Sequence, residues 1–428
     1  MKSFYIETYG CQMNLSDSET MAGILISAGL EPADMPESAD LIVVNTCAVR
    51  ESAVTRVKAQ ISRFKSLRKE KGVKIAIAGC LAEHEREGLL KKLPVDYVVG
   101  PDHYRFLAEI IEMKSGTIAA GGEERDFYDG FPPVRKKGGN AWVPVMRGCD
   151  NYCAYCVVPY VRGREKSRPA EAVMRAVESA VAEGFPEMTL LGQNVNSYRD
   201  KDLDFAGLLR RVDAVPGLAR LRFMTSHPKD LSEELLRCFG TLPSLCESLH
   251  LPVQSGSDRV LAAMNRGYTR ERYLGLVERL RERVPDIALS TDVLCGFPGE
   301  TEEDHARTLS LLQEVRFDAA FMFLYSPRKG TAAAAFAETL TRGEKVRRVN
   351  EVIALQMGIT KEKNRACIGR TLEVRVEGIS PRDAAALTAR TRTHKNVILR
   401  GGPSLIGKTL TVKITGSSGW ALLGETLK

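Results

Sequence analysis

Three closely spaced cysteines are the first residues in this chain that could do chemistry. The stretch "MRGCDNYCAYCVVPYVRGRE" holds Cys149, Cys153 and Cys156 in the spacing C-x3-C-x2-C. Structural zinc sites take four ligands and usually show paired C-x2-C units, so three cysteines leave such a site one ligand short. His250 or Cys295 could complete a zinc site, but a cubane iron–sulfur cluster can take three cysteines and leave one iron open. The spacing therefore favours an iron–sulfur cluster.

Three further cysteines share one topological position. Cys11, Cys47 and Cys80 each stand at the carboxyl end of a predicted strand, in "SFYIETYGC", "DLIVVNTC" and "KIAIAGC". Parallel α/β sheets form ligand sites at these ends, so we expect the three thiols to share one site. The alternative is that each is a small buried hydrophobe near a strand end. The remaining cysteines are expected to be structural: Cys238, Cys246, Cys295 and Cys367.

Three predicted domains and a linker must position these residues. Residues 1–118 alternate strand and helix, which predicts an α/β domain with a parallel sheet, closed by a helix near residues 104–114. Residues 119–139 are a linker rich in Gly, Pro and charge. Residues 140–364 contain six βα units and predict a partial (βα)6 barrel, with chemistry at the carboxyl ends of its strands. Residues 365–428 are short alternating segments that predict a five-stranded β-barrel.

The composition is that of an ordinary soluble globular protein, with 44% apolar and 27% charged residues in 428. The N-terminus lacks the apolar segment of a secretory signal, and no apolar run reaches the roughly 18 residues of a membrane span. We therefore expect a cytoplasmic protein. Its ten cysteines would stay reduced there and serve metal binding or catalysis.

Positive charge is concentrated at the C-terminus. Residues 365–428 contain 11 Lys and Arg against 4 Asp and Glu, a surplus of 7 that equals the net charge of the whole chain, +7. A basic terminal domain on a neutral body indicates a polyanionic partner, most often nucleic acid. The alternative is a solvated face with no partner.

The cysteine triplet, with the aromatic Tyr155 before its last member, resembles the radical S-adenosylmethionine (SAM) superfamily. The resemblance spans essentially the whole chain and is closest to the methylthiotransferases of the MiaB type, which act on tRNA. It rests on "ETYGCQMN", "NTCAVRESA", "GCDNYCAYCVVPYVRGREKSR", "LLGQNVNSY", "TSHP", "HLPVQSGSDRVLAAMNRGYTRERY" and "DVLCGFPGETEED". The C-terminal segment resembles a TRAM domain, an RNA-binding module.

This resemblance implies two 4Fe-4S clusters and SAM as cofactors. The C-x3-C-x2-C cysteines would hold the radical SAM cluster, and the three strand-end cysteines would hold an auxiliary cluster. One SAM would donate a methyl group to sulfur, and another would yield the radical that abstracts hydrogen from C2 of an adenine. The implied product carries a methylthio group on N6-dimethylallyladenosine at tRNA position 37, on the 3′ side of the anticodon.

The resemblance also places residues around SAM. Gln193 ends the second barrel strand, where many radical SAM enzymes carry a GGE-like motif for the SAM amino group. The alternative for Gln193 is a polar residue that satisfies strand-end backbone groups. Tyr155, Ser226 and Gln254 are expected at the same rim. Arg162 and Arg164 follow the cluster loop and are expected either to contact SAM or phosphate, or to be exposed arginines with no role.

The expected macromolecular partner is the tRNA anticodon stem-loop that carries N6-dimethylallyladenosine. Arg390, Arg392 and Lys395 in "ARTRTHKNVIL" are expected phosphate contacts. An electron donor such as flavodoxin or ferredoxin and a sulfur source or iron–sulfur carrier are also expected, and the protein is expected to be a monomer away from membranes. Lys329 and Ala332 in "SPRKGTAAA" replace two prolines common in the family, which could loosen the loop after the last barrel strand.

Two other functions stay open at this point. Sister methylthiotransferases act on threonylcarbamoyl-adenosine in tRNA or on an aspartate of a ribosomal protein, although "VVPYVRGRE" and "GQNVN" favour the dimethylallyladenosine type. A non-catalytic, metal-stabilised RNA-binding protein would hold zinc and would not cleave SAM.

Overall fold

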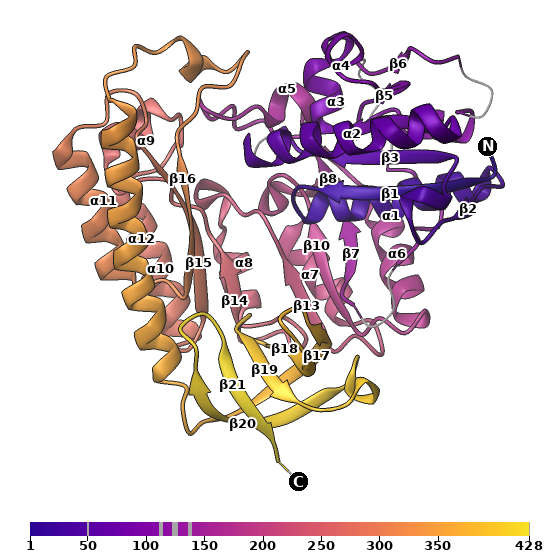
Figure 1. Cartoon of the computed structure of the whole chain (residues 1–428). Helices are drawn as coiled ribbons and strands as arrows, with labels where there is room; N and C mark the ends of the chain where they lie inside the picture. The colour runs from indigo at the N-terminus through magenta and orange to yellow at the C-terminus, as the bar shows by residue number, and fades with distance from the viewer. Residues whose placement is uncertain (49–50, 111–113, 122–126, 136–138, 428) are drawn as a thin grey trace.

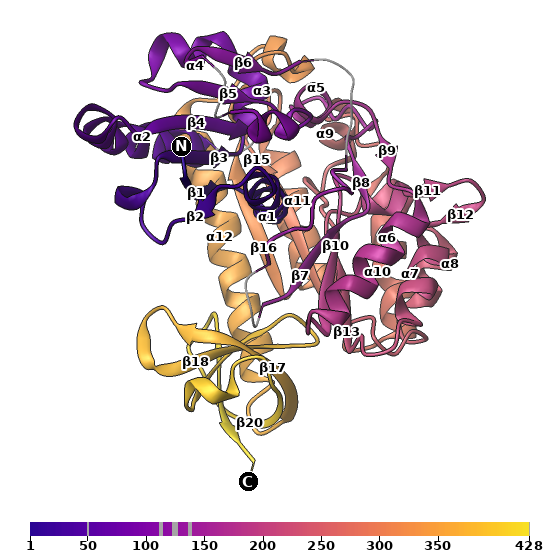
Figure 2. The same cartoon turned by 90° about the vertical axis from the view of Figure 1, so that its right-hand side faces the viewer.

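The computed structural model describes residues 1–48, 51–110, 114–121, 127–135 and 139–427. An N-terminal α/β part, a central β/α part and a C-terminal β-barrel follow one another along the chain (Figure 1). The N-terminal and C-terminal parts lie at opposite ends of the central part (Figures 1 and 2). Helix α12 (Arg342–Arg365) runs along the central part and leads into the C-terminal barrel.

The N-terminal part is built on a six-stranded parallel sheet in the order β2-β1-β3-β4-β5-β6. Its strands are β1 (Ser3–Tyr9), β2 (Glu31–Pro32), β3 (Leu41–Thr46), β4 (Lys74–Gly79), β5 (Tyr97–Val99) and β6 (Thr117–Ala119). Every residue of β3 is buried, as its run of apolar residues predicts for a parallel strand covered on both faces.

Helices cover both faces of this sheet. The core on one face includes residues of α1 (Gln12–Ser27) and of the 3-10 helix η2 (Tyr104–Ala108). The core on the other face includes residues of α2 (Glu51–Lys71), α3 (Cys80–Glu85) and α4 (Glu87–Lys92). The predicted helix over residues 104–114 is wrong. The segment forms only a short 3-10 helix, at whose start the Tyr104 amide donates to Tyr128 Oη at 3.1 Å, and residues 111–113 lie outside the described part.

Six parallel strands form the wall of the central part. They are β7 (Ala141–Pro144), β10 (Glu187–Leu191), β13 (Arg220–Phe223), β14 (Ser248–His250), β15 (Ala288–Cys295) and β16 (Ala319–Leu324). They pair as β13-β10-β7 and β14-β15-β16, and a parallel bridge between Leu221 and Leu245 joins the two sets. No pairing among the described residues closes β7 onto β16, so the predicted partial (βα)6 barrel is confirmed.

Amphipathic helices surround this wall and share one large apolar core with it. They are α6 (Ala170–Ala182), α7 (Phe205–Asp213), α8 (Glu233–Cys238), α10 (Arg270–Arg283), α11 (Glu302–Val315) and α12. Capping boxes start the last two: Thr301 with Asp304 on α11, and Thr341 with Glu344 on α12. Within the described ranges, none of the helices combines the length and apolar composition that a bilayer crossing requires.

The C-terminal part is a closed five-stranded barrel, as predicted, in the order β17-β18-β19-β21-β20. Its strands are β17 (Thr371–Ser380), β18 (Asp383–Thr391), β19 (Asn396–Arg400), β20 (Thr409–Ser417) and β21 (Leu422–Thr426). It docks on the amino ends of the central strands. Arg220 pairs with Glu373 at 2.7 Å, and Arg222 Nη2 donates to the Thr391 carbonyl at 2.8 Å. The carboxyl ends of the central strands are thereby left to the N-terminal part.

Candidate active site

The three strand-end cysteines come together at one edge of the N-terminal sheet. Strands β1, β3 and β4 are neighbours, and Thr46 at the end of β3 pairs with the last residues of both other strands. Cys47 and Cys80 directly follow β3 and β4, and Cys11 follows β1 after one glycine. Parallel register therefore brings three residues that are far apart in sequence to one place. We call Cys11, Cys47 and Cys80 the strand-end triad.

Two glycines allow this close approach. Gly10, with φ +150°, would carry a Cβ only 2.9 Å from the Cys47 Cβ, and Gly79, with φ +90°, would carry one 2.6 Å from the Thr46 carbonyl oxygen. A side chain at either position would push the cysteine-bearing turns apart. The turns are also tied by buried Asn45, whose Nδ2 donates to the Asn14 carbonyl at 2.7 Å.

The chemistry of the strand-end triad fits a metal cluster. Burial raises the pKa of the Cys80 thiol to about 12, against the lowering effect of Arg162, and Cys47 and Cys11 raise it further. A metal centre that binds here has to displace thiol protons. Within the described ranges, no three Cys, His, Asp or Glu side chains meet tightly enough to hold a single metal ion. A cubane cluster binds each cysteine at a separate iron, so its ligands need not converge on one point.

Cys149, Cys153 and Cys156 lie on one loop at the carboxyl rim of the central barrel. The loop follows the short strand β8 (Met146–Arg147) and precedes helix α5 (Val158–Arg162). Burial raises the pKa of Cys149 to about 11 and that of Cys156 to about 12, and Cys153 raises both further. The three thiols, which we call the loop triad, therefore lie within electrostatic reach of one another.

The turn before α10 clamps the loop triad. The Ala154 amide donates to the Met264 carbonyl at 2.9 Å, and Asn265 Nδ2 donates to two loop carbonyls at 3.1 and 3.2 Å. Arg266, only 5% exposed, donates from Nη1 to the Cys153 sulfur at 3.3 Å. The loop is thus fixed by contacts from the opposite half of the barrel, which favours a preorganised metal site.

Helix α5 reaches from the loop triad to the strand-end triad. Arg162 at its end is buried, at 3% exposure, so its expected place as an exposed arginine is wrong. Its Nε donates to the Cys80 sulfur at 3.1 Å, and its Nη2 donates to Asp17 Oδ2 at 2.6 Å. Side chains of Val157 and Val161 share a buried cluster with Cys80. Sequence pattern alone did not signal this, because α5 and α3 meet only through the packing of two domains.

Gln193 and Gln254 lie at strand ends of the rim. Gln193 Oε1 accepts from the amide of Gly148, the residue directly before the loop triad, at 2.6 Å. Gln193 therefore satisfies a backbone group, which was the alternative expected for it from sequence. Gln254 has φ +69° and is 8% exposed, and its backbone is bound on both sides to β15. The roles of both residues toward SAM stay predictions.

Three buried polar atoms at the rim have no hydrogen-bond partner among the described residues: Asn194 Oδ1, Ser226 Oγ and His227 Nε2. All three side chains are at most 5% exposed. Burial lowers the pKa of His227 to about 2, and Arg266 and Lys229 lower it further. His227 Nδ1 accepts from the Lys229 amide at 3.3 Å, so the neutral ring carries its proton on Nε2. Such unmet capacity in a buried place fits a polar ligand like SAM. Only Ser226 is among the residues expected from sequence.

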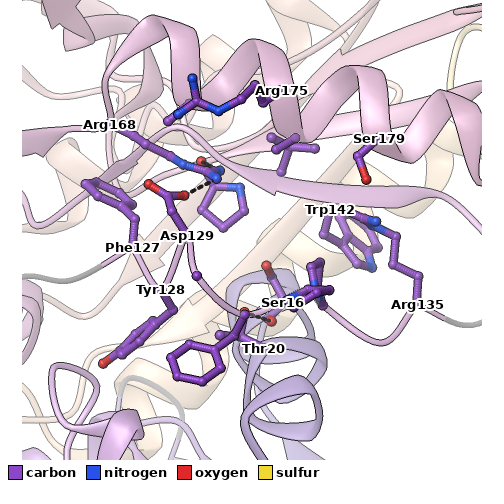
Figure 3. A pocket seen from close by; sticks show the side chains of 18 residues that line it. Ser16, Thr20, Phe127, Tyr128, Asp129, Arg135, Trp142, Arg168, Arg175 and Ser179 are labelled. Atoms are coloured by element: carbon purple, nitrogen blue, oxygen red, sulfur yellow. Dashed lines mark hydrogen bonds and ion pairs between the residues drawn. The ribbon is translucent and has the colours of Figure 1, made fainter. Parts of the chain in front are cut away.

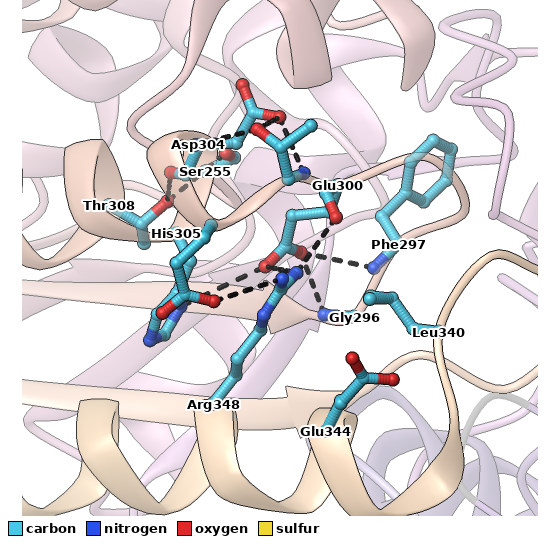
Figure 4. A network of polar contacts seen from close by, with 12 residues as sticks. Ser255, Gly296, Phe297, Glu300, Asp304, His305, Thr308, Leu340, Glu344 and Arg348 are labelled. Carbon is cyan, nitrogen blue, oxygen red and sulfur yellow. Dashed lines mark hydrogen bonds and ion pairs between the residues drawn. The ribbon is translucent and has the colours of Figure 1, made fainter.

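The turn after β15 is made rigid by a buried carboxylate (Figure 4). Glu300 Oε2 accepts from the amides of Gly296 and Phe297 at 2.8 and 3.2 Å, while its Oε1 accepts from Arg348 Nη1 at 3.0 Å. Phe297 packs in one apolar cluster with residues that include Tyr325, and Tyr155 lies against this cluster. The predicted SAM residue Tyr155 thus lies between the loop triad and the ends of the last two central strands.

The N-terminal part contacts the loop after β16, where two family prolines are absent. His84 on α3 lies 3.1 Å from the Lys329 carbonyl oxygen, and the Ala333 amide donates to the Ala154 carbonyl at 2.7 Å. The segment that carries Lys329 and Ala332 is therefore fastened both to α3 and to the loop triad.

The predicted RNA contacts are engaged within the protein. Arg390 pairs with Glu377, and Arg392 forms bonds of 2.8 to 3.2 Å with Glu247 and two carbonyls of the central part. Lys395 pairs with Asp318 at 2.8 Å. Arg392 and Lys395 therefore fasten the C-terminal barrel to the central part. Whether any of the three also contacts phosphate stays a prediction.

A cavity of about 340 Å³ lies between α1 and α6, beside residues 127–135 (Figure 3). Arg135, Arg168 and Arg175 line it together with Trp142. Arg168 pairs with Asp129, and Arg135 pairs with Glu183 at 2.7 Å. These ion pairs join the segment before β7 to the central barrel, so the cavity lies at the interface between the N-terminal part and the central part.

Family comparisons agree with this architecture. The uncharacterized protein family UPF0004 matches residues 3–100, the radical SAM superfamily matches residues 143–312, and the TRAM domain matches residues 365–427. Fold and sites therefore define a radical SAM enzyme that carries an additional cysteine-bearing α/β domain and a TRAM barrel. This class uses SAM and a 4Fe-4S cluster.

Similar protein sequences identify the family within this class of radical SAM enzymes. A tRNA-2-methylthio-N(6)-dimethylallyladenosine synthase of Carboxydothermus hydrogenoformans is 45% identical over 426 residues and covers 97% of each chain. The enzyme of the same name from Geobacter sulfurreducens is 47% identical over 439 residues, covering 99% of this chain and 97% of its own. The chain therefore belongs to the family of the tRNA-2-methylthio-N(6)-dimethylallyladenosine synthases.

Solved structures share the fold at low identity. The radical SAM methyltransferase TsrM of Kitasatospora setae, with cobalamin and a [4Fe-4S] cluster bound, matches with a TM-score of 0.60 and 17% identity, covering 78% of this chain and 74% of that one. The cobalamin-dependent enzyme OxsB matches with a TM-score of 0.53 and 13% identity, covering 83% and 56%.

Proposed function

We propose that this enzyme transfers a methylthio group to C2 of N6-dimethylallyladenosine at position 37 of tRNA. The arrangement of its two cysteine triads carries the proposal. One triad lies at the carboxyl edge of the N-terminal sheet, the other lies at the carboxyl rim of the barrel, and α5 contacts both. This arrangement suits a reaction in which a sulfur and a radical must reach the same carbon. The relatives named for this reaction support the same substrate.

Each triad is proposed to hold a 4Fe-4S cluster. We assign the radical SAM cluster to Cys149, Cys153 and Cys156, and a second, auxiliary cluster to Cys11, Cys47 and Cys80. When bound, the clusters and SAM supply the methyl group, the sulfur and the 5′-deoxyadenosyl radical that takes hydrogen from C2. An aromatic C–H bond is inert to acid–base chemistry, so bound cofactors have to supply this reactivity.

The rim residues are proposed to bind SAM. Asn194, Ser226 and His227 supply the unmet hydrogen-bonding capacity described above, and neutral His227 acts as a donor through Nε2. Gln193 holds the loop triad in place through the Gly148 amide. Tyr155 and Gln254 are proposed to complete the same binding site.

Two exposed tyrosines beside the loop triad are proposed to receive RNA. Tyr152 is 41% exposed and Tyr160 is 51% exposed, and their ring centroids lie 6.1 Å apart in an edge-on arrangement. The target adenine has to leave its stack to reach the rim, and unstacked bases are commonly received on aromatic side chains. Tyr152 also adopts φ +45°, a strained conformation typical of functional sites.

The remaining assignments are proposals of the same kind. The domains span 1–118, 140–364 and 365–428, with a linker at 119–139. The protein acts as a cytoplasmic monomer and takes electrons from a donor such as flavodoxin or ferredoxin. Its sulfur comes from a separate sulfur source or iron–sulfur carrier. Arg390, Arg392 and Lys395 on the TRAM barrel are proposed to contact tRNA phosphate groups.

Mass spectrometry of tRNA nucleosides tests the function. Prenylated tRNA is incubated without oxygen with reconstituted protein, SAM, sulfide and a reductant. A methylthio group on the prenylated adenosine is the expected result. Cleavage of SAM without modified tRNA would contradict the substrate assignment and keep the radical chemistry. Absence of both products, with both clusters intact, would contradict the catalytic assignment.

A further inference from the structure

Arg162 is a buried cation placed on a cysteine of the strand-end triad by a different part of the protein. It ends α5, six residues after Cys156, whereas Cys80 begins α3 of the N-terminal part. Arg162 Nε lies 3.1 Å from the Cys80 sulfur, and the two side chains belong to residues that are only 3% and 6% exposed. The contact is therefore shielded from water.

A second set of contacts fixes the direction of this guanidinium. Asp17 on α1 accepts from Nη2 at 2.6 Å and from Nη1 at 3.5 Å, and Tyr104 Oη donates to Asp17 Oδ2 at 3.0 Å. Asp17 is 8% exposed and Tyr104 is fully buried. A planar guanidinium held on one side by a carboxylate presents its remaining N–H groups in a fixed direction, here toward Cys80.

The loop triad has a matching contact, because Arg266 Nη1 donates to the Cys153 sulfur at 3.3 Å. Arginine stays protonated in proteins, so each contact brings a permanent positive charge to a sulfur. Hydrogen bonds to ligand sulfurs and the net charge around a cluster set its reduction potential. A donor and a positive charge favour the reduced state, which carries one more negative charge.

We propose that Arg162 is the positioning residue of the auxiliary cluster: it orients Cys80 and raises the reduction potential of the cluster bound there. The inference rests on the proposed second cluster. Helix α5 would then not only follow the loop triad in the chain but also set, through Arg162, the reduction potential of the neighbouring cluster.

The test uses a full-length protein in which Cys149, Cys153 and Cys156 are replaced by alanine, so that any remaining iron–sulfur signal belongs to the strand-end triad. Arg162→Gln removes the charge, and Arg162→Lys keeps the charge but loses the planar fork. Arg164→Gln is the matched control, because Arg164 lies two residues away, is 66% exposed at its side chain and pairs with Asp150 at 2.7 Å. Iron content and the midpoint potential, followed by electron paramagnetic resonance, are measured for each protein.

We expect the potential to become more negative in Arg162→Gln and to shift less in Arg162→Lys, with no shift in Arg164→Gln. If the parent protein binds no iron, the second cluster itself is refuted, and this inference falls with it. If iron is bound and neither Arg162 variant shifts the potential, the inference alone is overturned. If Arg162→Gln does not retain iron, the midpoint potential of Arg162→Lys is compared with that of the parent protein, and an unchanged potential overturns the inference.

Discussion

Replacing Gly148 with alanine is expected to disable the loop triad. Gly148 stands directly before Cys149 with φ +76°, and a Cβ added to it would lie 2.0 Å from the Arg164 carbonyl oxygen. Ordinary Cβ contacts begin at 3.4 Å, so the loop and the backbone after α5 would have to separate by about 1.4 Å more. The left-handed conformation adds roughly 1–2 kcal/mol of strain. Because a 1 Å misplacement of catalytic groups costs on the order of 100-fold in rate, we expect a loss of at least this size.

The assay is the rate of SAM cleavage to 5′-deoxyadenosine by the reconstituted protein, together with its iron content. Gly184→Ala is the matched control, since Gly184 has φ +91° but no atom within 4 Å of an added Cβ. The control bears the same backbone strain without the collision, so its cleavage rate should stay within about twofold of the parent, given strain of only about 1–2 kcal/mol far from the loop. Full iron content and an unchanged rate in Gly148→Ala would refute the argument that this glycine sets the loop.

Three further predictions address the clusters, the domain contact and pH. Cys80→Ala should halve the iron content, whereas Cys246→Ala, which removes a buried cysteine outside both triads, should leave it unchanged. Glu187→Gln leaves the buried Arg222, 3.0 Å away, without its carboxylate, so denaturant unfolding should show a loss of about 3–5 kcal/mol; Glu303→Gln, in an exposed pair, should lose under about 1 kcal/mol. His227 has a folded pKa of about 2, below its ordinary 6.5, so below pH 6.5 the unfolded state binds a proton that the folded state does not. The loss of stability due to this group should be about 1.4 kcal/mol per pH unit between pH 6.5 and the folded pKa, so the unfolding free energy of His227→Gln should depend less steeply on pH than that of the parent by this amount.

The sequence was sufficient to predict that the strand-end cysteines lie together, because this depends only on the order and direction of the strands in the sheet. Once β1, β3 and β4 are parallel neighbours, their carboxyl ends must lie at one edge, and residues that follow these ends meet there. The continuous apolar run of a strand such as β3, which is buried throughout, located the strands themselves. The same reasoning located the loop triad, since it follows the first central strand in the chain.

The surroundings of the triads could not be predicted, because they depend on how separate domains pack. In the sequence, Arg162 is one of several basic residues after the cysteine loop, yet its partner Cys80 lies 82 positions away in the chain. Arg392 lies in a motif typical of RNA contacts, but a carboxylate of the central part, Glu247, holds it. His227 lies in "TSHP", a stretch that carries the family resemblance, and only the missing partner at its Nε2 marks it as a candidate site residue.

The short helix α5 explains why the two triads have to be understood as one site. Helix α5 spans Val158–Arg162, about 6 Å from its first to its last residue at the helical rise of 1.5 Å per residue, and Cys156 lies two residues before it. Because Arg162 contacts Cys80, this short segment joins Cys156 of the loop triad to Cys80 of the strand-end triad. Any movement of the N-terminal part that carries Cys80 away from the barrel must therefore break the buried contacts of Arg162 with both Cys80 and Asp17. Such movement would give up charge-assisted hydrogen bonds, so the contacts of Arg162 favour the arrangement in which the two triads lie close together.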